Sequence, residues 1–172
     1  MNAWLGIAIA LTVGLVSALQ TSMLGALGRG RAPVEAAWIS LLGSAAAISA
    51  VLLIRLLRGG TSSLPAPLDR PLTFAIGAAV GLALLTISLR GIPWYYGAAG
   101  LGGVIYLATA ALLVPRLGVA VFFGATTAGS VLGALALDRL GAFGAPPLPL
   151  SITRVGGMAL LLAGVVVTRL GK

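Results

Sequence analysis

The stretch WLGIAIALTVGLVSALQTSMLGALGRGRAP, residues 4 to 33, decides which folds are open to this chain. It runs from Trp4 to Leu27 without a charged residue and then meets Arg29 and Arg31. A helix needs roughly 20 mostly apolar residues, at about 1.5 Å each, to cross a hydrocarbon core about 30 Å thick. The uncharged part is therefore long enough to cross a bilayer as one helix, and the two arginines mark its return to water.

The whole chain has the composition of an integral membrane protein. Apolar residues make up 59% of it and charged residues only 8%, with a mean hydropathy of +1.12. Ordinary soluble domains carry about 25% charged residues. Apolar stretches recur up to the C-terminus, whereas a cleaved signal peptide would leave a hydrophilic remainder. We therefore expect the first apolar stretch to be retained in a multi-pass protein of the cell membrane.

Six apolar stretches approach the length of a span. They predict an all-α fold, a polytopic membrane helix bundle that forms a single transmembrane domain over residues 1–172. The predicted spans are Trp4 to Leu27, Val34 to Leu57, Leu72 to Leu89, Tyr96 to Val114, Val119 to Leu137 and Ser151 to Leu170. The third is the shortest convincing run. The sixth reaches full length only if Arg154 and Arg169 extend toward the headgroups.

The junctions between these stretches carry helix-start and interface signals. Pro33 suits the first turn of the second span, and Glu35 complements the positive end of that helix dipole. Trp94, Tyr95 and Tyr96 predict a headgroup anchor before the fourth span. The sequence VPRLG predicts a very tight turn before the fifth span, and DRLGAFGAPPLPL, rich in Pro and Gly, predicts a surface loop.

Several classes of function are disfavoured by residues that the chain lacks. It has no Cys and no His, which removes thiol nucleophiles, haem ligation, imidazole bases and the usual zinc ligands. We therefore expect no metal site, no cofactor and no enzyme activity. The net charge of +8 comes from Lys and Arg spread between the spans, which favours contact with membrane lipid over nucleic acid. The sequence GAAGLGG, residues 97 to 103, lacks the strand and acid of a dinucleotide loop and predicts a close-packed helix start.

The charges that flank the spans give almost no preference for one orientation. With six spans, one side would carry Arg55, Arg58, Arg70, Arg116, Arg169 and Lys172, and the other Arg29, Arg31, Arg90, Arg139 and Arg154. If residues 72–89 fail to cross, the division is again about six to five. Such a chain can insert both ways up, and two copies could then form an antiparallel dimer whose inverted symmetry suits alternating access. The alternative is that one strong local determinant fixes a single orientation.

Small residues at four-residue spacing predict ridges along which helices pack closely in lipid. They are Ala10, Gly14, Ala18, Ser22 and Ala26, then Gly77 and Gly81, then Ala125, Gly129 and Gly133. The pattern leaves open whether these ridges pack within one chain or between two chains.

Gln20 lies deep in the first span, not far from the membrane midplane. At about 100° per residue it is roughly opposite Ala18 and Ser22, and it sits about 13 Å from Arg29 along the helix. A carboxamide facing hydrocarbon there would be costly, so Gln20 should face another helix or a wet cavity. The sequence does not distinguish an interhelical hydrogen bond from contact with a substrate.

Other polar side chains at mid-span could share a substrate-binding cavity with Gln20. They are Ser17, Ser40, Ser44, Tyr106, Thr109, Thr126, Thr127 and Ser130. The alternative for each Ser and Thr is a hydrogen bond to a carbonyl of its own helix. Tyr106, roughly 15 Å beyond Tyr96, offers an aromatic face and a hydroxyl, and it could also hold a cation.

The three acidic residues all fall at span ends or in connections. They are Glu35, Asp69 and Asp138. A carboxylate that exchanges protons for a cationic substrate should lie inside the bundle, so this mechanism has no obvious carrier. Glu35 is the remaining coupling candidate, with helix capping or pairing to the preceding arginines as the alternative. Asp138 beside Arg139 predicts an interfacial ion pair.

The second half of the chain carries a family resemblance. The sequences LLVPRLGVAVFFGATTAGSVLGALALDRLGAFG and PLSITRVGGMALLLAGVVV resemble the YdcZ-like family of the drug/metabolite transporter superfamily, as does, more loosely, ALQTSMLGALGRGRAPVEAAWISLLGS. The resemblance implies a five-helix transporter half of the cell inner membrane, which assembles as an antiparallel homodimer or as a heterodimer with a paralogue. Residues 72–89 would then be an inserted sixth span that places both termini on one side.

Two positions depart from the family pattern. The pattern resembles Gln20 followed four residues later by Asn, where this chain has Leu24, and it commonly has Gln at the position of Ser130. Both changes make the site less polar. We therefore expect a secondary transporter of a small molecule whose identity the family does not supply. The alternative is a non-transporting subunit that stabilises or regulates another membrane protein.

Overall fold

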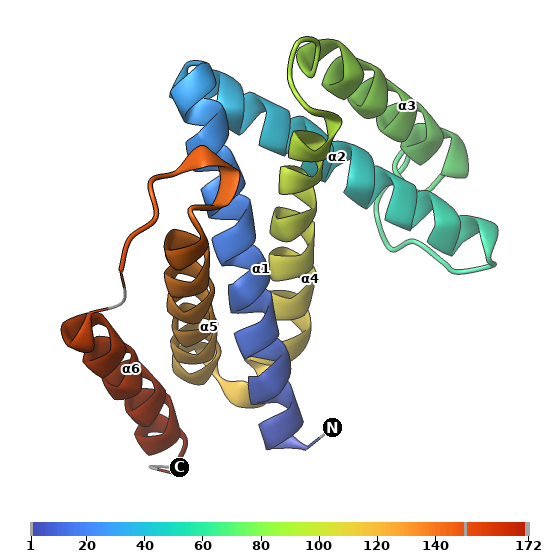
Figure 1. The fold of residues 1–172 in the computed structure, drawn as a ribbon. Coiled ribbons are helices and arrows are strands. Elements are labelled where there is room, and N and C mark those ends of the chain that lie inside the picture. The colour runs from blue at the N-terminus through green and yellow to red at the C-terminus, as the bar shows by residue number, and fades with distance from the viewer. Residues whose placement is uncertain (1, 150, 171–172) are drawn as a thin grey trace. The chain divides into compact units, whose positions relative to one another are not determined.

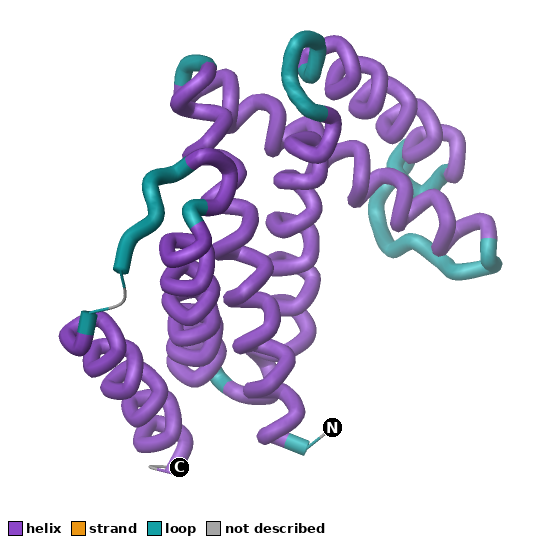
Figure 2. Tube along the Cα trace, in the orientation of Figure 1, coloured by secondary structure: helices purple, strands orange, loops and turns teal. Residues whose placement is uncertain are grey.

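The computed structural model describes residues 2–149 and 151–170, and this part of the chain is all-α as predicted (Figure 1). The long helices are α1 (Ala3–Gly30), α2 (Pro33–Leu57), α3 (Pro71–Ser88), α4 (Ala99–Leu117), α5 (Val119–Leu140) and α6 (Ile152–Leu170). Two short 3-10 helices, η1 (Trp94–Ala98) and η2 (Ala142–Gly144), precede α4 and follow α5. Figure 2 shows helices joined by loops, with no strand in the described residues.

Each of the six predicted spans is a helix long and apolar enough to cross a membrane. The fourth continues further than expected, because Pro115 and Arg116 are helical and α4 ends at Leu117. The turn into α5 is then made by Gly118 alone, at a φ of 84°. A side chain is strained at such an angle and glycine is not, so glycine permits a one-residue reversal between two spans.

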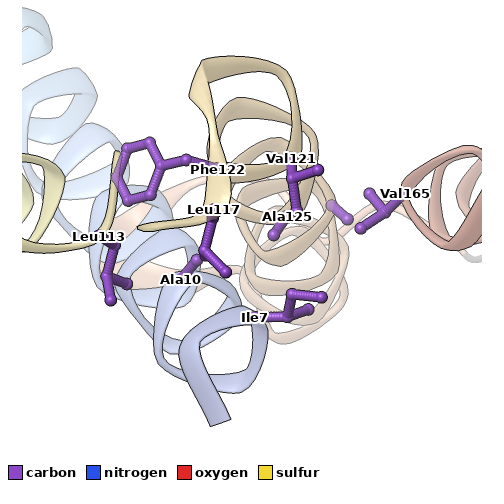
Figure 3. Close-up of a cluster of buried hydrophobic side chains, with 9 residues drawn as sticks. Ile7, Ala10, Leu113, Leu117, Val121, Phe122, Ala125 and Val165 are labelled. Atoms are coloured by element: carbon purple, nitrogen blue, oxygen red, sulfur yellow. The ribbon is translucent and has the colours of Figure 1, made fainter. Parts of the chain in front are cut away.

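The helices divide into two compact units, of which the first contains residues 1–26 and 105–172 and the second residues 27–104. In the first unit, a cluster of buried apolar side chains joins α1, α4, α5 and α6 (Figure 3). Its members are Ile7, Ala10, Leu113, Leu117, Val121, Phe122, Ala125, Ala128 and Val165. In lipid this packing stabilises by close contact between helices rather than by removing apolar surface from water.

The predicted ridges of α1 and α5 meet each other within the first unit. A Cβ built on Gly14 would lie 2.7 Å from the backbone nitrogen of Ser130, and closer still to the carbonyl oxygen of Thr126. A Cβ on Gly129 would lie 2.8 Å from the carbonyl carbon of Leu11. Real side chains do not tolerate such distances, so glycine is what lets these two backbones touch. At this contact, the ridges pack within one chain.

In the second unit, α2 packs against both α3 and the start of α4. A Cβ on Gly81 of α3 would lie 3.1 Å from the Cβ of Ala46. At the other contact, a Cβ on Gly43 would lie 2.7 Å from the carbonyl oxygen of Gly97, and a Cβ on Gly100 would lie 2.6 Å from the carbonyl carbon of Gly43. The glycines of GAAGLGG therefore start α4 in close contact with α2, as the sequence predicts.

Arg31 ties the end of α3 to the loop between α1 and α2. Its Nη1 donates to the carbonyl of Ser88 at 3.2 Å and its Nη2 to the carbonyl of Arg90 at 2.8 Å. The last carbonyls of a helix lack partners in the helix and carry partial negative charge, which a guanidinium satisfies well. The α1–α2 loop and the end of α3 thus lie at the same end of this unit. This matches the six-span division of charges, in which Arg29, Arg31 and Arg90 share one side.

Candidate functional site

The first unit contains an open groove of about 450 Å³ along α1 and α4. It is lined by Leu5, Ala8, Ile9, Thr12, Val13 and Val16 of α1, and by Ile105 and Thr109 of α4. Its volume lies within the roughly 300–1,000 Å³ that small-molecule sites occupy. The lining is apolar except for the two threonines and includes no charged residue, so the groove suits an uncharged guest.

The two threonines offer different hydrogen-bonding groups to this groove. Thr12 Oγ1 donates to the carbonyl of Ala8 at 3.0 Å, which occupies its proton and leaves its oxygen as an acceptor. Thr109 is half-buried, and its hydroxyl makes no hydrogen bond to any described residue. Thr109 therefore has both a donor and an acceptor available. Sequence reasoning named Thr109 among the mid-span polar residues but missed Thr12.

Gln20 lies on the helix face that continues the groove. Thr12, Val16 and Gln20 follow one another at four-residue spacing, so their side chains lie one turn apart on the same side of α1. Gln20 is half-buried, one turn beyond the last groove residue of that helix. Thr12 could have been predicted from the sequence, because it lies two four-residue steps before Gln20 and therefore on the same face of the helix.

Tyr106 faces α5 instead of the groove. Its ring lies with its centroid 5.7 Å from that of Phe122, in a tilted arrangement, and it packs against the buried cluster of the first unit. Its neighbour Ile105 lines the groove. Tyr106 thus fixes the rotation of α4 that presents Ile105 and Thr109 to the groove.

Three predicted site residues form hydrogen bonds within their own helices. Ser17 Oγ donates to the carbonyl of Val13 at 3.0 Å, and Ser130 Oγ donates to that of Thr126 at 2.9 Å. Thr126 is a buried residue, 4% exposed, and its Oγ1 donates to the carbonyl of Phe122 at 3.0 Å. A hydrogen bond to a carbonyl of the same helix is the alternative to a substrate contact that the sequence left open for each Ser and Thr. Thr127, the next residue of α5, is exposed.

Ser44 and Glu35 belong to the second unit. Ser44 Oγ lies 2.7 Å from the carbonyl of Gly100 and 3.0 Å from that of Ser40, so its hydroxyl joins α2 to α4. Glu35 is exposed in the first turn of α2, which begins at Pro33 as predicted. Within the described part of the chain, Glu35 forms no salt bridge. Capping by its charge is therefore the role that its position supports most directly.

The ion pair predicted for Asp138 has a different partner. Asp138 Oδ2 lies 3.3 Å from Nη1 of Arg154, across the connection between α5 and α6, whereas Arg139 was expected. Adjacent residues of a helix point about 100° apart, so a side chain from another segment reaches Asp138 more easily. Both side chains are about 40% exposed, so the pair stabilises by no more than about 1 kcal/mol.

The match to a family of known proteins covers almost the entire chain. The model of the family described as "Putative inner membrane exporter, YdcZ" matches residues 5–167. The chain belongs to the YdcZ family. It is therefore a multi-pass membrane protein of a transporter class, and its groove residues, from Leu5 to Thr109, all lie within the region that matches the YdcZ model. Neither a curated protein nor a solved structure is significantly similar to it.

Proposed function

We propose that this YdcZ-family chain is a secondary transporter of an uncharged small molecule, which it carries by alternating access as an antiparallel dimer. The observation that carries this proposal is the groove along α1 and α4, with an apolar lining, two threonines and no charged group. An apolar pocket with a few placed polar groups is the usual form of a small-molecule site.

The distribution of acids supports an uncharged substrate. The chain has three acidic residues, of which Glu35 lies in the first turn of α2, Asp69 precedes α3 and Asp138 pairs with Arg154. None lies in the middle of a span. A charged molecule in the groove would lose its hydration without gaining a counter-charge, at a cost of several kcal/mol.

The charge tally supports the antiparallel dimer. A division of about six to five allows both orientations of a single gene product, and two inverted copies supply the symmetry that alternating access requires. The groove of one chain is open along one side, and a second copy would close it against lipid.

Within this proposal, three side chains contact the solute and others hold the helices around it. Thr109, Thr12 and Gln20 bind the solute through a hydroxyl, an oxygen and a carboxamide. Ser17, Thr126, Thr127 and Ser130 belong to the helices that pack at the α1–α5 contact. Tyr106 supports α4, and Ser44 joins α2 to α4. Gln20 cannot carry a proton, so if transport is coupled to protons, Glu35 is the coupling candidate.

Purified protein in proteoliposomes tests the proposal, with radiolabelled solutes sorted into neutral, cationic, anionic and zwitterionic sets. We expect uptake or binding in the neutral set. Thr109→Val should lower uptake of an accepted solute about fivefold, the equivalent of one neutral hydrogen bond. Thr86→Val is the matched control, because Thr86 lies in α3, outside the groove lining. Uptake confined to cations would contradict the proposal. If no set of solutes shows either flux or binding, the alternative of a non-transporting subunit is favoured.

A further inference from the structure

We propose that the second unit carries a phosphate-binding site, separate from the groove, that holds the headgroup phosphate of an anionic membrane lipid. The site is a pocket of about 210 Å³ at the C-terminal end of α2. It is lined by Leu52, Arg55, Leu56, Thr61, Ser62, Ser63, Leu64 and Phe74.

The pocket has an apolar part and a polar part. Leu52, Leu56 and Phe74 form the apolar wall, and Phe74 is only 8% exposed. Arg55 and the three hydroxyl residues form the polar part. A lipid headgroup has the same two-part chemistry, with a phosphate attached to an apolar body.

The guanidinium of Arg55 is available to bind a ligand. It makes no hydrogen bond or ion pair to any residue that the structure describes. It is also not needed to cap the helix, because backbone groups do so: Gly60 N donates to the Arg55 carbonyl at 3.0 Å, and Gly59 N to the Leu56 carbonyl at 3.0 Å. A guanidinium with five free donors matches the oxygens of a phosphate.

The loop after α2 folds back against the stem of Arg55. A Cβ built on Gly60 would lie 2.8 Å from Arg55 Cγ, so glycine allows the backbone to fold back this closely. The hydroxyls of Thr61 and Ser63 make no hydrogen bond within the described residues. Ser62 Oγ accepts from the backbone nitrogen of Leu64 at 3.2 Å, which leaves its proton to donate. Arg55 and three residues that carry hydroxyl groups therefore line the same small pocket.

Location and charge both favour a lipid phosphate. The pocket lies where α2 ends and the connection to α3 begins, and both helices are long and apolar enough to span the membrane. The segment holds Arg55, Arg58 and Arg70 against the single acid Asp69. Basic residues at this level attract anionic lipids, by about 1 kcal/mol each. The volume of 210 Å³ is below the roughly 300 Å³ at which drug-sized sites begin, which favours a headgroup fragment over a transported solute.

Binding of phosphatidylglycerol to the purified full chain in a neutral detergent tests this site, by native mass spectrometry and thermal unfolding. Phosphatidylcholine and inorganic phosphate are the comparison ligands. We expect phosphatidylglycerol to bind more tightly than either and to raise the melting temperature. Arg55→Gln should weaken this binding about 10-fold or more, since one charged donor is lost.

Arg58→Gln is the matched control, because Arg58 carries the same charge in the same segment but does not line the pocket. It should weaken binding much less than Arg55→Gln. The double variant Thr61→Val, Ser63→Ala should also weaken binding, although it retains all arginines. It therefore tests the pocket independently if Arg55→Gln causes a folding defect. Equal losses for the two arginine variants would overturn the proposal in favour of diffuse attraction. If inorganic phosphate binds as tightly as phosphatidylglycerol, the site binds free phosphate and the proposal of a lipid headgroup is wrong.

Discussion

Arg31 holds the backbone of Arg90 through a hydrogen bond of 2.8 Å from its Nη2. The two residues lie on different connections, one after α1 and the other after α3. Their contact requires the chain to leave this end of the unit through α2 and to return to it through α3. The contact between Arg31 and Arg90 is therefore the most specific structural support for α3 as a helix that crosses the membrane back to the side where α2 began.

The sidedness of these connections follows from that contact. The chain has no native cysteine, so single cysteines at Gly30, Ser63 and Pro93 can be labelled without background. All three positions are exposed. With an impermeant thiol reagent, we expect equal labelled fractions at positions 30 and 93, and the complementary fraction at position 63, whatever the mixture of orientations. If the labelled fraction at position 93 instead equals that at position 63, α3 does not cross the membrane.

Loss of the Arg31 side chain should destabilise the second unit. Arg31→Gln removes charge-assisted bonds to two carbonyls, and we expect a loss of about 1–3 kcal/mol in the free energy of unfolding. Arg90→Gln is the control, because the Arg90 contact uses its backbone oxygen and not its side chain. Unfolding in mixed micelles measures both. Equal stability of the two variants would show that the Arg31 bonds contribute nothing.

The α1–α5 contact should tolerate no added methyl group at Gly14. Gly14→Ala would place a Cβ against the backbone of Ser130, and we expect a destabilisation of about 1–3 kcal/mol. Gly25 lies on the same helix with nothing within 4 Å of its built Cβ. Gly25→Ala should therefore be neutral or stabilise by up to about 1 kcal/mol. A similar effect of both substitutions on unfolding would contradict the close approach.

Dual insertion makes a prediction about the C-terminus. Two reporters fused there, one active only inside the cell and one only outside, should both give signal, because the flanking charges are divided about six to five. Activity of a single reporter would instead indicate a strong local determinant of orientation, and it would remove the basis for the antiparallel dimer.

Gln20 should matter more for transport than for folding. Gln20→Ala removes the carboxamide one turn beyond the groove, so uptake of an accepted solute should fall by about fivefold or more. The yield of folded protein, measured by size-exclusion chromatography, should change little. A proportional fall in yield and uptake would assign Gln20 to a structural hydrogen bond.

The sequence predicted the features that depend on spacing along one helix. Six apolar runs gave the six helices, and the small residues at Gly14 and Gly129 gave a close contact, because period and length are local properties. The partner of Asp138 and the contact of Arg31 with Arg90 could not be predicted in this way. Both join segments that are distant in the sequence, and only the packing of helices decides which ends meet.

The candidate site was predicted in part for the same reason. Gln20 and Thr109 were identified as polar residues within spans, and the structure places Thr109 in the groove and Gln20 on its face. The hydroxyls of Ser17 and Ser130 bond to their own helices, a choice that sequence spacing allows but does not determine.

A thiol placed in the α1–α4 groove shows whether this groove is the transport path. Thr109→Cys introduces the only cysteine of the chain at the groove wall, and Thr86→Cys introduces one outside the groove. Uptake into proteoliposomes is measured before and after reaction with a methanethiosulfonate reagent, with and without excess neutral solute. We predict that modification at position 109 abolishes uptake, that the solute slows this modification, and that modification at position 86 does neither. Full uptake by protein completely modified at position 109 would show that the groove is not the transport path.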